Sequence, residues 1–284
     1  MLDLILPVIK SFWDEEQPPM QWNQGIISNV WKGKGDREKM ENQRGITVSS
    51  SVGTIVEEIM TDRLMQTINF TQAQAGGRKG GSTTDHVFVL KAIISTALKR
   101  GMELIVTFYD IKKAYDRANM DDMLYVVNNE GFNGKIWRLT RSLSKDLTAK
   151  IKTKAGLTRE IKRITGGKQG GKVMVPFFAK MMDTLSEDLE NDVELGITID
   201  DLSIACMEYV DDVDSFAIGY KQQEKTLIAM NEFATKHQFE WASEKCKVME
   251  IGGHKIKRKE WQLGEKKIGA CDTYKYLGET IARD

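Results

Sequence analysis

The feature that most constrains this chain is a short buried strand that ends at a carboxylate. The run Leu104-Ile105-Val106-Thr107-Phe108 is rich in β-branched and aromatic residues and follows Gly101, a pattern that predicts a buried β-strand. Asp110 stands at the C-terminal end of this run, where sheets packed with helices tend to present functional groups. The sequence therefore predicts an acidic functional group at one edge of a buried sheet.

A second acidic pair, Asp211-Asp212, lies roughly a hundred positions later. The apolar-rich runs 204–207 and 213–218 flank it and predict the arms of a β-hairpin with both acids at the tip. If this hairpin neighbours the strand that ends at Asp110, three carboxylates meet in one small volume. Like charges that close raise one another's pKa unless a cation is present, and Mg²⁺ is the usual cation where phosphates are handled. Taken singly, an acid after a strand or at a hairpin tip is ordinary turn chemistry.

Bulk properties are typical of a globular protein and exclude several other classes. Hydrophobic residues make up 41% of the chain and charged residues 29%, which excludes a disordered chain. No apolar run approaches the roughly 20 residues that span a bilayer. The first seven residues carry Asp3 and no basic residue, unlike a secretory signal peptide. The three cysteines are odd in number and far apart, which argues against a disulfide framework or a zinc site. We therefore expect an intracellular protein, cytoplasmic or nuclear, that is neither secreted nor bound to a membrane.

The net charge is zero, which counts against a nucleic-acid-binding protein because such proteins usually carry a basic balance. The charge is uneven, however, and basic residues cluster in 32–39, 78–79, 162–172 and 255–267. Such runs are most often solvated faces. They become a binding surface only if the fold gathers them on one side.

Helical and strand patterns alternate irregularly along the chain. Helices are predicted from Thr54 to Ile68, after the N-capping residues 82–85, over about 121–127, from Ile136 to Leu147, from Phe178 to Leu189 and over roughly 222–237. A β-hairpin is predicted within 148–164, short strands in the tail, and glycine-rich loops at 76–81 and 166–171. This irregular order predicts an α+β fold or a mixed sheet and not a regular βαβ winding.

Short motifs follow one another along nearly the whole chain: 22–36, Asn42-Gln43-Arg44-Gly45-Ile46, 74–83, 108–116, 166–170, 209–212, Lys245 and Tyr276-Leu277-Gly278. In this order they resemble the motifs of reverse transcriptases, most of all those of LINE-type non-LTR retrotransposons. The resemblance implies a right-hand polymerase of the α+β class with an antiparallel palm sheet backed by helices. It implies a fingers-like region over 1–103 and mainly palm over 104–284, with some fingers elements between 117 and 165 and the primer-grip motif at the end. The family's thumb is expected to be missing.

The resemblance assigns the catalytic roles to Asp110, Asp211 and Asp212. Phosphoryl transfer needs positioning and charge neutralisation more than covalent chemistry. Two Mg²⁺ ions, for which Mn²⁺ can substitute, would activate the primer 3′-hydroxyl and stabilise the leaving pyrophosphate. The expected metal ligands are Asp110, Asp211 and the carbonyl of Ile111, whereas Asp212 is expected nearer the outer shell.

The resemblance also implies the substrate contacts. The dNTP is expected to meet Arg78, Tyr115, Gln169 and Lys245. Arg78 would offer its guanidinium fork to the triphosphate. The ring of Tyr115 would fill the volume that a ribose 2′-hydroxyl needs, and Lys245 would donate a proton to pyrophosphate. The simpler interpretations are that Arg78 is an exposed loop residue, Tyr115 a core residue and Lys245 a surface residue. Nucleic acid is expected at Lys32, Lys34, Arg44, Lys168, Gly170, Tyr276, Leu277 and Gly278.

The implied partners are an RNA template, a DNA primer or nicked target DNA, and dNTPs. The thumb and an endonuclease would belong to missing regions of a longer polyprotein. After Gln169-Gly170 the family usually continues with a small polar residue and Leu-Ser-Pro, whereas residues 171–176 here are Gly-Lys-Val-Met-Val-Pro, and Gly77 replaces a more typical aromatic. Two alternatives stay open: an inactive relic that only binds nucleic acid, and another palm enzyme such as a nucleotide cyclase. The segments around Arg44 and Gln169 favour the polymerase, because a cyclase has no template to position.

Overall fold

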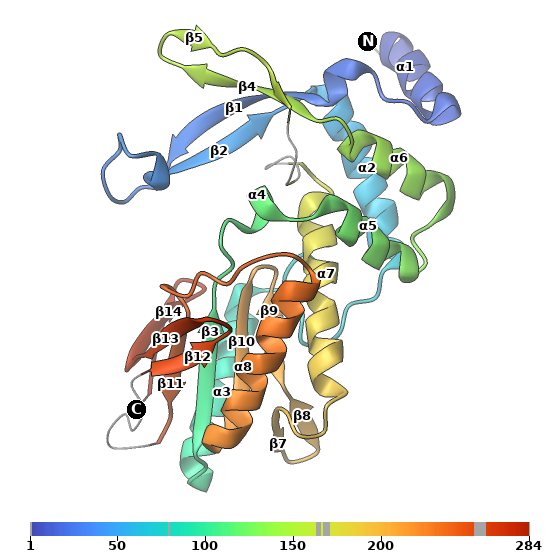
Figure 1. The fold of residues 1–284 in the computed structure, drawn as a ribbon. Coiled ribbons are helices and arrows are strands. Elements are labelled where there is room, and N and C mark those ends of the chain that lie inside the picture. Colours follow the sequence, from blue (N-terminus) through green and yellow to red (C-terminus); the bar gives the residue numbers. More distant parts are fainter. Residues whose placement is uncertain (1, 79, 163–165, 167–170, 253–259, 284) are drawn as a thin grey trace. The chain divides into compact units, whose positions relative to one another are not determined.

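The computed structural model of the chain describes residues 2–78, 80–162, 166, 171–252 and 260–283. The chain forms two compact units that interleave in sequence (Figure 1). Unit 1 holds residues 1–69 and 115–177, and unit 2 holds residues 70–114 and 178–284.

Unit 1 combines helices with a small sheet. Its helical elements are α1 (Leu2–Glu15), η1 (Met20–Trp22), η2 (Met40–Asn42), α2 (Ser51–Thr67), α4 (Ala114–Arg117), α5 (Met120–Asn129) and α6 (Gly134–Ser144). Its strands are β1 (Gln24–Trp31), β2 (Gln43–Val48), β4 (Thr148–Thr153), β5 (Gly156–Leu157) and β6 (Ile161–Lys162). The strand order is β2-β1-β4-β5, and β6 also pairs with β4. The hairpin predicted within 148–164 is therefore confirmed as the antiparallel pair β4–β5.

Helix α2 shows why this unit folds as its pattern predicts. The hydroxyl of Ser50 accepts a hydrogen bond from Gly53 N, which caps the first turn. Val56, Met60 and Leu64 then recur at a spacing of four residues and are all buried. Val56 and Met60 pack in a core that also includes residues of α1, η1 and α6.

Unit 2 is built around a six-stranded sheet. Its strands are β3 (Leu104–Tyr109), β9 (Cys206–Tyr209), β10 (Asp212–Ile218), β11 (Lys247–Glu250), β12 (Glu260–Leu263) and β13 (Lys266–Ala270), in the order β12-β13-β11-β3-β10-β9. Two small hairpins accompany it, β7 (Ile197–Ile199) with β8 (Leu202–Ile204) and β14 (Thr273–Tyr276) with β15 (Glu279–Ala282). Its helices are α3 (Thr83–Arg100), α8 (Gly219–Lys236) and most of α7 (Met174–Glu190), which starts in unit 1.

The prediction of an antiparallel sheet needs one correction. β3 is antiparallel to both of its neighbours, and β12 is antiparallel to β13, but β11 and β13 run parallel. The cause is the tight turn at Gly264, which folds β12 and β13 into a hairpin. β13, the second strand of that hairpin, then lies beside β11 in the same direction.

Helices cover both faces of this sheet. Leu104, Val106 and Phe108 of β3 pack in a core cluster with the buried face of α3. The alternate residue Thr107 points to the other face, where its hydroxyl accepts a hydrogen bond from Gln223 Nε2 of α8 at 2.7 Å. Figure 1 shows α8 crossing this sheet. Among the described residues, none of the helices is long and apolar enough to cross a membrane. All three cysteines are free thiols.

Candidate active site

β3 carries Asp110 to one end of the main sheet of unit 2. All six residues of the strand are buried, as the sequence predicts. Beyond the strand, Ala242 N donates to Asp110 O at 2.7 Å and Lys112 N donates to Glu240 O at 2.9 Å. These two bonds flank Ile111, which forms a bridge with Trp241. The main chain at Asp110 and Ile111 is therefore fixed on the sheet.

The hairpin of β9 and β10 brings the other two acids to the same end of the sheet. Asp212 is the first residue of β10 and pairs with Tyr209, so Val210 and Asp211 form the turn. β10 lies beside β3 and antiparallel to it, and Asp212 precedes the paired stretch just as Asp110 follows it. The two acids therefore lie at the tip of a hairpin next to the strand that carries Asp110.

The charges of these acids act on one another. The pKa of Asp212 is raised to about 6, first by burial and then by the negative charges of Asp211, Asp110 and Asp214. The ammonium of Lys245 acts in the opposite direction. A carboxyl with this pKa is partly protonated near neutral pH, and a bound cation would favour its ionised form.

Lys245 already supplies one cation to this group. Its Nζ lies 2.7 Å from Asp110 Oδ1 and 2.9 Å from Oδ2. The lysine side chain is 59% exposed and that of Asp110 is 29% exposed. An ion pair so open to water contributes only about 0–1 kcal/mol. Asp110 can therefore exchange this partner for another cation at little cost.

The donor set fits a hard divalent cation, although the described residues contain no ready cluster of three His, Cys, Asp or Glu side chains that could hold a metal ion. The acids offer only carboxylate oxygens, the ligands that Mg²⁺ prefers. The nearby thiol of Cys246 has its pKa raised to about 11, mainly by burial, so it stays protonated and is a poor metal ligand. Asp110, Asp211 and Asp212 fit Mg²⁺ or Mn²⁺ in chemistry, and metal binding requires Asp110 to leave Lys245.

The segment before the predicted glycine loop joins the sheet beside β9. Ala75 N donates to Glu208 O at 2.8 Å, and Glu208 N donates to Ala73 O at 2.9 Å. Arg78 follows a few residues later, and its Nη1 donates to Thr71 O at 3.1 Å. This pairing fixes where the loop of Arg78 begins in unit 2.

A buried polar network lies behind the hairpin of β9 and β10. The hydroxyl of Tyr276 donates to Asp214 Oδ1 at 2.7 Å, and His86 Nε2 lies 3.0 Å from that hydroxyl and 3.5 Å from Asp214 Oδ1. All three side chains are at most 3% exposed. The ring of Tyr276 thus faces the core, and Leu277 and Gly278, both with positive φ, form the turn after it. A nucleic-acid contact at this motif would run through that turn.

Sequence reasoning gave no role to the buried polar residues Gln74, His86, Glu208 and Asp214 of this unit. Asp214 carried a signal, because it interrupts the apolar run 213–218. His86 lies one position before Val87 on the apolar side of its helix. Neither position reveals its partners, since these come from distant segments.

The remaining predicted site residues lie in unit 1 or outside the described residues. Lys32 and Lys34 are exposed in the segment after β1, and Arg44 is exposed on β2. Tyr115 lies half-buried on α4. Residues 168–170, which include the predicted contacts Lys168, Gln169 and Gly170, lie outside the described residues.

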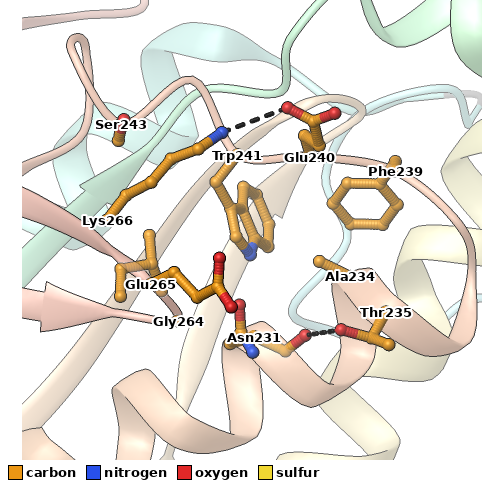
Figure 2. A pocket seen from close by; sticks show the side chains of 11 residues that line it. Asn231, Ala234, Thr235, Phe239, Glu240, Trp241, Ser243, Gly264, Glu265 and Lys266 are labelled. Carbon is orange, nitrogen blue, oxygen red and sulfur yellow. Dashed lines mark hydrogen bonds and ion pairs between the residues drawn. The ribbon is translucent and has the colours of Figure 1, made fainter.

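A pocket of about 690 Å³ opens elsewhere in unit 2, between the end of α8, residues 239–243 and the turn 263–266. Figure 2 shows Lys266 reaching Glu240 across it, at an Nζ–Oε2 distance of 3.1 Å. None of the three carboxylates lines this pocket. Two residues that line it, Glu240 and Trp241, belong to the segment that pairs with residues 110–112. The pocket itself is not part of the candidate site.

A protein-family model described as reverse transcriptase (RNA-dependent DNA polymerase) matches residues 32–281. The Retrovirus-related Pol polyprotein from type-1 retrotransposable element R2 of Popillia japonica is 28% identical over 181 residues, 63% of this chain and 25% of that protein. The RNA-directed DNA polymerase from mobile element jockey of Drosophila melanogaster is 22% identical over 293 residues, 99% of this chain and 31% of that protein. Two telomerase structures, from Candida albicans (12% identity) and Candida tropicalis (14%), each match 94% of this chain with a TM-score of 0.58, covering 48% and 52% of their own chains.

This chain belongs to the reverse transcriptase family, because the family model covers most of its length. Its relatives connect it with the non-LTR retrotransposon enzymes R2 and jockey, so the predicted family is confirmed. The fold is a mixed α/β fold that matches telomerase over most of the chain. The chain spans only 25–31% of the curated relatives that it matches.

Proposed function

We propose that this chain carries the fingers and palm of an RNA-directed DNA polymerase from a non-LTR retrotransposon. Unit 2 would be the palm and unit 1 the fingers of a right-hand polymerase. One observation carries the proposal: Asp110 and the pair Asp211-Asp212 lie at one end of a buried sheet, where burial, and after it the charges of Asp211 and Asp110, raise the pKa of Asp212. Family membership supplies the reaction to which such a group of acids is suited.

The three acids would have different roles. Asp110 and Asp211, with the carbonyl of Ile111, would hold two Mg²⁺ ions, and Asp212 would support them from beside the hairpin turn. When bound, these ions supply charge neutralisation at the reacting phosphate oxygens. Lys245 would leave Asp110 as substrate and metal bind, and its ammonium would then be near enough to protonate the departing pyrophosphate. Its ion pair with Asp110 supports this role.

Substrate recognition would use the residues that the family resemblance assigns. Arg78 would bind triphosphate oxygens, with Gln169 beneath the new base pair and Tyr115 against the sugar. The RNA template and the DNA primer would meet the basic residues Lys32, Lys34, Arg44 and Lys168 and the backbone at Gly170 and 276–278. Because the relatives are several times longer, a thumb and an endonuclease would come from other parts of a longer protein.

Primer extension on matched RNA and DNA templates tests this proposal. We expect dNTP incorporation on the RNA template that requires Mg²⁺ or Mn²⁺. Asp110→Asn keeps the shape of the side chain and removes its charge, so activity should fall at least about a thousandfold, or about 4 kcal/mol of transition-state stabilisation.

Asp200→Asn is the matched control. Asp200 forms an exposed ion pair with Arg100 at 2.6 Å in the same unit, away from the three acids. Its replacement should leave extension unchanged. Nucleic-acid binding by wild type without any extension would favour the inactive relic, and nucleotide conversion without a template would favour a cyclase. Near-wild-type extension by Asp110→Asn would refute the mechanism.

A further inference from the structure

The turn that presents Asp211 has an unfavourable backbone. Val210, the residue before Asp211, is buried and has φ +61°. In this left-handed region a β-branched side chain collides with its own backbone, so valine adopts it only where the surroundings impose it. Contacts from other residues of unit 2 must therefore hold Val210 in this conformation.

Gln74 forms a hydrogen bond to the turn. It is fully buried, and its Oε1 accepts from Val210 N at 3.0 Å and from Gly76 N at 2.9 Å. Its Nε2 donates to Glu208 Oε2 at 2.9 Å and to Ala179 O at 3.2 Å. The amide thus makes four hydrogen bonds, the number that a Gln side chain can form.

Gly76 completes the contact from the other side. A Cβ at Gly76 would lie 2.6 Å from Val210 Cγ2 and 2.6 Å from Val210 N. Only glycine lets the two backbones approach so closely. The segment is itself anchored, because Ala73 and Ala75 pair with Glu208 on β9.

We propose that Gln74 and Gly76 form a clamp that holds Val210 in its left-handed conformation and so sets the position of Asp211. Gln74 is then a positioning residue that acts through Val210. The clamp also joins the hairpin to the segment leading to Arg78, so the expected triphosphate contact and the carboxylates share one support. This inference rests on the proposed polymerase function for its effect on catalysis, but not for the clamp itself.

Gln74→Met tests the clamp, because methionine keeps the length and shape of the side chain and removes all four hydrogen bonds. Gln223→Met is the matched control: Gln223 is also fully buried and bonds Thr107 on another part of the sheet. Both variants lose a buried amide, and only Gln74→Met releases the turn.

Amide hydrogen exchange gives a readout that does not depend on activity. In Gln74→Met the Val210 amide should exchange at least about tenfold faster, because a buried hydrogen bond is lost. The amide of Phe216, which bonds Ala205 O within the sheet, should exchange as in wild type. Equal exchange at Val210 in wild type and Gln74→Met would overturn the clamp, whether or not the protein polymerises.

Catalysis and metal binding give the second readout. At saturating dNTP, kcat of Gln74→Met should fall about tenfold to a hundredfold, since small displacements of a reacting group are costly. Mn²⁺ binding, measured by electron paramagnetic resonance without substrate, should weaken in parallel. Gln223→Met should match wild type in both. If wild type extends primers and Gln74→Met does so equally well, the clamp is refuted while the proposed function stands.

A rescue experiment separates positioning from simple loss of stability. Glycine adopts φ +61° without strain, so Gln74→Met combined with Val210→Gly should recover most of the lost kcat. A purely structural loss at Gln74 would not be repaired by a change in the turn. Failure of the double variant to exceed Gln74→Met in kcat, with both folded, would overturn the proposal. If Gln74→Met does not fold, Gly76→Ala carries the same test from the other side of the turn.

Discussion

Removing a single hydroxyl, in Tyr276→Phe, should destabilise unit 2 far more than a surface change of the same size. This hydroxyl donates to Asp214 Oδ1 at 2.7 Å and lies 3.0 Å from His86 Nε2. The carboxylate of Asp214 is fully buried, and its Oδ2 has no hydrogen-bond partner among the described residues. Loss of the hydroxyl leaves Asp214 Oδ1 with the more distant His86 Nε2, at 3.5 Å, among its described side-chain contacts.

The magnitude follows from the two bonds lost. A buried hydrogen bond to a charged group contributes about 1.5–3 kcal/mol, and a neutral one about 0.5–1.5 kcal/mol. The bond from Tyr276 to Asp214 is of the first kind, and the contact with His86 is of the second. We expect the free energy of unfolding of unit 2 to fall by about 3 kcal/mol, out of the 5–15 kcal/mol typical of a domain.

Native-state hydrogen exchange measures this quantity for unit 2 alone. Amides in the buried centre of β3 and β10 should exchange through global opening of the unit, so their exchange free energy reports its stability. Tyr274→Phe is the control on the same strand: the ring of Tyr274 stacks on Phe108 at 4.3 Å, and no hydrogen bond to its hydroxyl occurs within the described residues. It should change the stability by less than about 0.5 kcal/mol.

A second variant decides whether the buried charge is the cause. Asp214→Val with Tyr276→Phe removes the buried carboxylate together with its hydroxyl donor, so the double variant should be more stable than Tyr276→Phe alone. A Tyr276→Phe variant within about 0.5 kcal/mol of wild type would refute the reasoning. So would a double variant whose loss is the sum of the two single losses.

Two further predictions concern single residues of the same unit. Lys245→Gln should lower the Mg²⁺ concentration for half-maximal primer extension, because no ammonium then competes for Asp110. Its kcat should fall about a hundredfold if Lys245 protonates the leaving group. An unchanged Mg²⁺ dependence would contradict the exchange of Lys245 for a metal ion. Burial, followed by the charge of Asp183, raises the pKa of Glu208 well above its ordinary value, so the folded state keeps a proton that the unfolded state loses above about pH 4.3. Stability should therefore fall as pH rises, by up to about 1.4 kcal/mol per pH unit, and Glu208→Gln should remove this slope in urea unfolding at pH 5 to 8.

Local pattern was enough to find the parts of the site that depend on burial. The strand ending at Asp110 is fully buried, and a strand that is buried on both faces needs apolar side chains along most of its length. The hairpin of Asp211 and Asp212 was visible because two apolar arms flank a short polar turn. Both patterns are local, because they depend only on the order of apolar and polar side chains within each segment.

The residues that hold the site in place could not be found in this way. Gln74 is polar and precedes a glycine-rich loop, which is the pattern of an exposed turn. It is buried because residues 73–75 pair with β9, more than a hundred positions later. The parallel pairing of β11 with β13 is hidden for the same reason. Long-range pairings of short segments leave little trace in the sequence of either partner.

The polar groups of unit 2 differ in how easily they can change partner, and burial sets the difference. The Lys245–Asp110 pair faces water, where breaking it costs about 1 kcal/mol or less. Gln74 and the Asp214–Tyr276 pair are buried, where an unpaired group costs about 1–3 kcal/mol or more. A cation can therefore replace Lys245 without disturbing the hydrogen bonds that hold the hairpin. A site arranged in this way keeps its geometry while its charges are exchanged, which is what the proposed cycles of nucleotide addition would require.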